Sequence, residues 1–113
     1  MTHYMKLQKK PFEAIEKGQK TVEVRLYDRK RSKISVGDTI LFTLIGTENV
    51  IETLVISVKR FKTFQKLYEY YNDYTLLGYE KGETARSNDM YAYYTEEDET
   101  LYGVVALEIK KIY

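Results

Sequence analysis

The chain has 113 residues, of which 43% are hydrophobic and 31% are charged, and its formal net charge is +1. This size and balance predict one soluble globular domain over residues 1–113, and the absence of cysteine excludes a disulfide scaffold and thiolate chemistry. Residues 1–18 carry scattered charges and no apolar run, so we expect no signal peptide, no membrane span and a cytoplasmic location.

The first part of the chain predicts two strands separated by a short helix. Residues 4–8 and 21–27 alternate apolar and polar side chains, as half-buried strands do. Between them, Pro11 suits the first turn of a helix and Gly18 suits its end. The pattern therefore places a helix end directly before the second strand.

The middle of the chain predicts two more strands and a second helix. A polar loop at 28–33 and a Val-Gly-Asp turn lead into an apolar strand at 39–45. A Gly-Thr-Glu-Asn turn separates it from a long strand at 50–61 that is rich in β-branched residues. Thr63 can cap a helix over 64–71, where apolar residues recur at helical spacing.

The last third of the chain predicts a mixture of irregular and regular structure. We expect an irregular segment at 72–87, a short helix at 88–94, an exposed acidic loop at 96–99 and a final strand within 101–113. About five strands with two or three inserted helices give an α+β fold. A small curved sheet or β-barrel is the most economical way for this chain to bury its Val, Ile and Leu.

Metal and cofactor chemistry has little support in the sequence. His3 is the only histidine and there is no thiol, so neither a zinc site nor a histidine-based triad is expected. The glycines are dispersed and form no phosphate-binding fingerprint. We therefore expect no metal and no cofactor.

The distribution of charge and the tyrosine content are compatible with a nucleic-acid ligand. Ten basic residues face four acidic ones between Lys6 and Lys33, and the chain contains 12 tyrosines. A basic half favours an anionic partner, and tyrosine suits base-stacking platforms. A solvated surface and ordinary core packing would explain the same two features, and composition alone does not separate these readings.

The most distinctive stretch is Gly-Gln-Lys-Thr-Val-Glu-Val-Arg at 18–25. In a strand, Glu23 and Arg25 project to the same face, roughly 6–7 Å apart, and Lys20 lies just before the strand. A carboxylate flanked by two cations is either a structural ion pair or a base kept ionised by its neighbours. Arginine also offers a planar fork for a phosphate or a base edge.

This order of elements resembles the ASCH-domain family, in its compact prokaryotic branch. The resemblance covers nearly the whole chain and depends on the G-x-K-x-x-E-x-R motif of residues 18–25, on Gly37-Asp38, and on Tyr91 and Tyr102-Gly103-Val104 near the end. It implies a PUA-like β-barrel of about five to six strands with two to three short helices. It also implies that the motif lines a cleft between barrel and helices and that the domain binds RNA.

Some compact members of this family hydrolyse the amide of acetylated cytidine, and ribonuclease activity has been attributed to others. Lys20 matches the lysine of the amidohydrolase branch, but Glu23 stands where that branch has a threonine nucleophile, and Thr21 lies in a different register. The catalytic glutamate of that branch would correspond to Glu80 or Glu83, which the sequence does not decide. The amidohydrolase triad is therefore not reproduced in this chain.

The first functional hypothesis is a module that binds RNA or a nucleotide or nucleoside. Lys20 and Arg25 would contact phosphate or a base edge, and Glu23 would orient Arg25 or accept from an exocyclic amine. The residues expected to stack on a base are one or more of Tyr27, Tyr91, Tyr93 and Tyr94, and those expected to contact phosphates are Arg29, Lys30, Arg31 and Lys33.

The alternative is a small hydrolase acting on a modified nucleoside or on RNA. Glu23 would then be the general base, and Lys20 would stabilise the oxyanion. Two neighbouring cations should lower the pKa of the Glu23 carboxyl, which makes it a weak base near neutral pH. A protein-interaction adaptor using the acidic run at 96–99 is a third possibility that no residue demands. We therefore expect ligand binding first and catalysis second.

Overall fold

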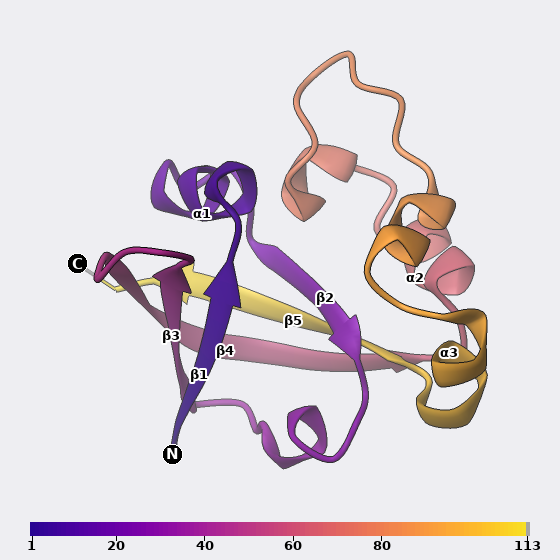
Figure 1. Ribbon diagram of the computed structural model, residues 1–113, viewed down its shortest axis with the longest axis horizontal. Helices are drawn as coiled ribbons and strands as arrows, with labels where there is room; N and C mark the ends of the chain where they lie inside the picture. Colours follow the sequence, from indigo (N-terminus) through magenta and orange to yellow (C-terminus); the bar gives the residue numbers. More distant parts are fainter. Residues whose placement is uncertain (113) are drawn as a thin grey trace.

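The computed structural model describes residues 1–112, and its centre is a five-stranded sheet that curls into a half-barrel (Figure 1). The strands are β1 (Thr2–Leu7), β2 (Val22–Leu26), β3 (Thr39–Leu44), β4 (Val50–Phe61) and β5 (Val104–Lys111). Their order in the sheet is β1-β3-β4-β5-β2; β1 and β3 pair in parallel, and the other pairs are antiparallel. The predicted α+β fold with a curved sheet is confirmed.

The curl of the sheet depends on the long strand β4. Its first half pairs with β3, from Val50 to Leu54, and its second half pairs with β5 as far as Phe61. The register shifts between Val55 and Ser57, and an irregularity of this kind bends a strand and increases its twist. One strand can therefore serve both halves of the sheet while they face different directions.

The two edge strands, β1 and β2, are joined by side chains rather than by a backbone ladder. Arg25 Nη2 donates to the carbonyl of Lys6 at 3.1 Å, and Lys30 Nζ donates to the carbonyl of Tyr4 at 2.8 Å. Both carbonyls belong to β1, whereas the two cations come from β2 and the loop that follows it. We call this junction the seam; it satisfies edge carbonyls that would otherwise be open to another strand.

Helices cover the two ends of the sheet (Figure 1). The α-helices are α1 (Lys9–Glu16), α2 (Phe64–Tyr70) and α3 (Glu96–Tyr102), and the 3₁₀ turns are η1 (Arg31–Lys33), η2 (Tyr74–Leu77) and η3 (Ser87–Ala92). The predicted cap of α2 is confirmed, because Thr63 Oγ1 accepts a hydrogen bond from the backbone N–H of Lys66 at 3.1 Å. In the part of the chain that is described, no helix combines the length and apolar character needed to cross a membrane.

The prediction of an exposed acidic loop at 96–99 is wrong, because these residues form the first turn of α3. Thr95 caps this helix by accepting from the backbone N–H of Asp98 at 3.1 Å. Four acidic residues in the first turn also interact favourably with the positive end of the helix dipole. Glu99 points inward and is only 5% exposed, so it belongs to the interior of the protein.

Two apolar clusters, one on each face of β5, hold these elements together. On one face, Val105, Leu107 and Ile109 join the cluster that contains α1 and β1. On the other face, Val104 and Ala106 pack with α2 and with the aliphatic side of β2. The alternation along the last strand is thus confirmed, and it leaves the polar side of β2 facing away from α2.

The carboxyl group of Asp38, the residue directly before β3, allows a test of how acid affects the stability of the protein. Asp38 accepts from the Ser35 N–H at 3.0 Å and lies 2.8 Å from His3 Nε2. The hydrogen bond to His3, then that from Ser35, lower the pKa of the Asp38 carboxyl to about 2. Because the folded pKa lies below the ordinary value of 3.8, this stabilisation is present above about pH 4 and is lost as the pH falls toward 2.

We therefore expect Asp38→Asn to be less stable than the wild type at neutral pH, with a difference that narrows between about pH 4 and pH 2. Urea denaturation at a series of pH values measures this difference, and Glu48→Gln in an exposed turn is the control. A difference that stays constant over the acid range would contradict the assignment.

Candidate functional site

Lys20, Glu23 and Arg25 meet in one ion-pair network. The Glu23 carboxylate lies between the two cations, with Oε1 at 3.0 Å from Lys20 Nζ and Oε2 at 2.9 Å from Arg25 Nη2. Arg25 Nε also donates to Oε2 at 3.1 Å, and the Val24 N–H donates to Oε1 at 3.3 Å. Both carboxylate oxygens therefore already accept from protein donors.

The network is buried, and its charges balance only in part. Glu23 is 3% exposed and Lys20 is 8% exposed. Burial opposes the charged form of Glu23, but the attraction of Lys20 and Arg25 outweighs it and lowers the pKa of that carboxyl. Glu23 is thus an ionised, fully hydrogen-bonded carboxylate at neutral pH, and one net positive charge remains in the network.

The end of η2 and the glycine that follows it hold Lys20 in place. Lys20 Nζ donates to the carbonyl of Leu77 at 3.1 Å, and the next residue, Gly78, has a φ of +105°. A Cβ at Gly78 would stand 3.1 Å from Lys20 Cδ and 3.6 Å from Lys20 Nζ. Glycine is required here both by the left-handed backbone and by the close approach of the lysine.

The network forms part of the wall of a cleft of about 550 Å³. The cleft lies between the seam of the sheet and the segment carrying η2 and η3, and it also contacts α1 and α2. Its basic lining residues are Lys6, Lys10, Lys20, Arg25 and Arg31, and its acidic ones are Glu23 and Asp89. A volume of this order suits a ligand the size of one nucleotide.

The tyrosines proposed from the sequence lie in different places. Tyr93 and Tyr94 line the cleft, and Tyr93 is 72% exposed. Tyr27 is outside it, with the guanidinium carbon of Arg60 3.9 Å from its ring centroid. Tyr91 is also outside the lining, and its hydroxyl donates to Glu99 Oε1 at 2.8 Å.

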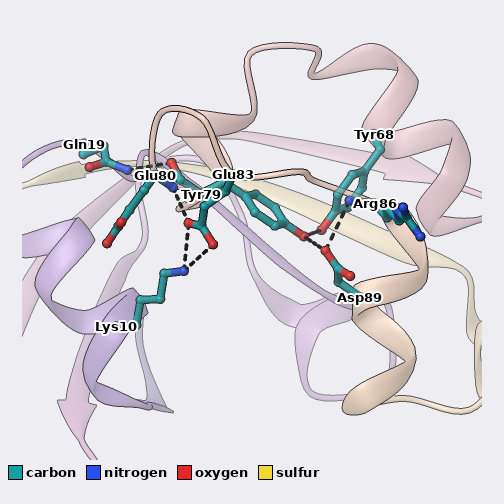
Figure 2. Close-up of polar contacts among 8 residues, drawn as sticks. All are labelled: Lys10, Gln19, Tyr68, Tyr79, Glu80, Glu83, Arg86 and Asp89. Carbon is teal, nitrogen blue, oxygen red and sulfur yellow. Dashed lines mark hydrogen bonds and ion pairs between the residues drawn. The ribbon is translucent and has the colours of Figure 1, made fainter.

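Among the lining residues that were not proposed from the sequence, Tyr68, Tyr79 and Asp89 form a chain of hydrogen bonds (Figure 2). Tyr79 donates to Asp89 Oδ2 at 2.8 Å, and the hydroxyls of Tyr68 and Tyr79 lie 2.9 Å apart. Burial and these two partners raise the pKa of Tyr79 far above its ordinary value, so its hydroxyl keeps its proton. The helical spacing of 64–71 indicated Tyr68 as a core residue, but no pattern in the irregular segment marked Tyr79.

Neither Glu80 nor Glu83 lines the larger cleft. Lys10 Nζ lies 2.8 Å from both carboxylate oxygens of Glu83, which ties the irregular segment to α1 (Figure 2). Glu80 lines a smaller adjoining cleft of about 330 Å³, which shares Lys10 and Gly78 with the larger one. The two glutamates therefore lie near the site without facing the network around Glu23.

Within residues 1–112, no group of three or more His, Cys, Asp or Glu side chains is arranged to hold a metal ion. The chemistry that the cleft offers comes from cations, amide and hydroxyl donors and aromatic rings. These groups suit an anionic, flat ligand that brings hydrogen-bond acceptors.

A curled half-barrel with a cleft between its seam and inserted helices is a PUA-like architecture. The family model of the ASCH domain matches residues 5–113, and the chain belongs to the ASCH domain family. A search of curated proteins found no match. The resemblance proposed from the residue 18–25 motif is thus confirmed at the level of the family.

Several solved structures share this fold over almost the whole chain. The crystal structure of the hypothetical protein PH0355 is 31% identical, with a TM-score of 0.82, and the match covers 99% of this chain and 100% of that one. Protein PF0455 from Pyrococcus furiosus, solved by NMR, is also 31% identical, with a TM-score of 0.74 and coverage of 99% and 98%.

A more distant neighbour is a mutant of ZmASCH from Zymomonas mobilis. Its crystal structure is 14% identical to this chain, with a TM-score of 0.67, and the match covers 96% of this chain and 67% of that one. At this identity the likeness concerns the fold alone.

Proposed function

We propose that the cleft binds single-stranded RNA or a nucleotide. The observation that carries this proposal is the combination of five basic residues and four tyrosines in a cleft of nucleotide size. The tyrosines are Tyr68, Tyr79, Tyr93 and Tyr94. A cleft of this volume excludes a duplex and admits an unstacked nucleotide, the form in which proteins read single strands.

Within this proposal, the Lys20–Glu23–Arg25 network is a preorganised part of the wall. Its excess positive charge attracts an anionic ligand, and the carboxylate holds both cations in one orientation. The exposed ring of Tyr93 offers a stacking surface for a base. The paired state of Glu23 favours binding over hydrolysis, because an ionised carboxylate with a lowered pKa and four donors is a poor general base.

The test uses lining residues whose loss leaves the buried network intact. We expect Tyr93→Ala to weaken the binding of a labelled single-stranded RNA by roughly tenfold or more, because a base loses its stacking partner. We expect Lys6→Gln to reduce the slope of log affinity against log salt by about 0.7, the contribution of one phosphate contact on a single strand. Fluorescence anisotropy at several salt concentrations measures both.

Matched controls separate the cleft from the general surface. Tyr4→Ala removes an exposed tyrosine outside the cleft, and Lys62→Gln removes an exposed lysine outside it. Both should bind RNA as the wild type does. Absent binding, affinity that ignores salt, or equal losses in the cleft and control variants would each refute the proposed function.

A further inference from the structure

One end of the cleft, next to the loop between β2 and β3, gathers three cations. Arg25 and Arg31 both line it, and Lys30 lies close to both. Burial, followed by repulsion from Arg31 and Arg25, lowers the pKa of the Lys30 ammonium group. Like charges that are held together in this way favour the binding of an anion between or beside them.

The nearby carboxylates of Glu23 and Asp28 do not accept hydrogen bonds from all of the N–H donors at this end of the cleft. Glu23 is shared between Lys20 and Arg25, and Asp28 Oδ2 accepts from Arg31 Nη1 at 2.8 Å. Asp28 Oδ1 accepts from the Arg31 backbone N–H at 3.0 Å, so Asp28 fixes both ends of that residue. Arg31 Nε is buried, and within residues 1–112 it has no hydrogen-bond partner. The contacts with Asp28 therefore leave part of the donor capacity of the Arg31 guanidinium unused within residues 1–112.

Tyr94 adds a hydroxyl donor at the same end. Its ring stacks on Phe64 with centroids 5.7 Å apart and an interplanar angle of 22°, which fixes the direction of the hydroxyl. Burial raises the pKa of Tyr94 although Arg25 and Arg31 both act against this rise. The hydroxyl therefore stays protonated at neutral pH, close to two guanidinium groups.

We infer that this end of the cleft is a phosphate site formed by Arg25, Arg31 and Tyr94, with Lys30 adding positive charge. The ligand is then a nucleotide or an RNA phosphodiester rather than a free nucleoside. This inference rests on the proposed function, because the base of the same ligand occupies the remainder of the cleft. A phosphate supplies negative charge and several acceptor oxygens, which guanidinium forks and a hydroxyl group can bind together.

The inference is tested by measuring how much a phosphate group on the ligand increases its binding affinity. Each of the four ribonucleosides, its 5′-monophosphate and a dinucleoside monophosphate is titrated by calorimetry into wild type, Arg31→Gln and Lys33→Gln. Lys33 belongs to the same 3₁₀ turn and is exposed outside the cleft, so its loss removes the same charge. In the wild type we expect a phosphate to improve affinity by roughly tenfold or more.

Arg31→Gln should reduce that gain to about threefold or less, and Lys33→Gln should retain the full gain. Arg31→Lys should give an intermediate value, since it keeps the charge without the fork. A gain that persists in Arg31→Gln, or no gain in the wild type, would overturn the inference. Preference for the monophosphate identifies a nucleotide ligand and preference for the diester identifies RNA; both support a phosphate site.

An NMR titration with inorganic phosphate tests the phosphate site separately from the proposed function. If no nucleoside, nucleotide or RNA binds, the proposed function is refuted, and the phosphate site is judged by NMR alone. In the wild type, saturable changes in the chemical shifts of Arg31 and Tyr94 on addition of phosphate would support the site. In Arg31→Gln, the change at Tyr94 should be lost. No saturable shift at these residues in the wild type would refute it.

Discussion

Replacing Glu23 by glutamine is expected to lower the free energy of unfolding by about 3–5 kcal/mol, because it leaves two buried cations without a counter charge. Lys20 is 8% exposed, and the side chain of Arg25 is 14% exposed, so water cannot fully replace the carboxylate. Because the pKa of Glu23 is lowered in the folded state, the stabilisation is present at neutral pH and declines as the pH falls below its ordinary value of 4.5.

Urea denaturation followed by circular dichroism measures this loss, and Glu48→Gln, at an exposed turn, is the matched control with an expected change within about 0.5 kcal/mol. Replacing the network as a whole, by Lys20→Met, Glu23→Leu and Arg25→Met together, should recover much of the stability, since no charge is left unpaired. A Glu23→Gln protein as stable as its control would mean that the pairing does not persist in solution.

Replacing Glu99 by alanine is expected to lower the free energy of unfolding by about 2–4 kcal/mol, because the buried Phe64 N–H and the part-buried Tyr91 hydroxyl lose a charged acceptor. Glu99 Oε2 accepts from the Phe64 N–H at 2.7 Å, and Oε1 accepts from the Tyr91 hydroxyl at 2.8 Å. One carboxylate thus joins α3 to the start of α2 and to η3. We also expect weaker RNA binding, since η3 leads directly into Tyr93 and Tyr94 on the cleft wall.

Glu97→Ala is the matched control, because Glu97 lies in the same helical turn but is exposed. It removes the same charge from the helix start, where one acidic residue contributes about 0.3–1 kcal/mol. Equal losses in the two variants would show that Glu99 acts through the helix dipole and not through its hydrogen bonds with Phe64 and Tyr91. Chemical denaturation and the RNA anisotropy titration give the two readouts.

Patterns among neighbouring residues in the sequence predicted the strands and the position of the residue 18–25 motif well. Alternation identified β2, the β-branched run identified β4 with the bounds Val50–Phe61, and Thr63 marked the start of α2. The strand repeat also placed Glu23 and Arg25 on one face, where the structure has them in contact. These features were accessible because neighbours in the sequence determine them.

The features that the sequence did not predict depend on distant contacts. The acidic run was interpreted as a loop because charge suggested exposure, although Thr95 three residues before Asp98 is a capping pattern that could have indicated α3. Tyr79 had no periodic signal, because its role comes from meeting Tyr68 and Asp89 in space. The parallel pairing of β1 with β3 likewise has no signature in either strand.

The seam between β1 and β2 differs in kind from the contacts between the other neighbouring strands of the sheet. A backbone ladder holds strands at a nearly fixed spacing of about 4.8 Å, whereas a bond from a side chain to a carbonyl yields when the side chain rotates. Arg25 both donates to the Lys6 carbonyl and lines the cleft, so it links the wall of the cleft to the edge strand β1. The contact between β1 and β2 therefore depends on two side chains, Arg25 and Lys30, whereas the other neighbouring strands of the sheet are held by backbone ladders.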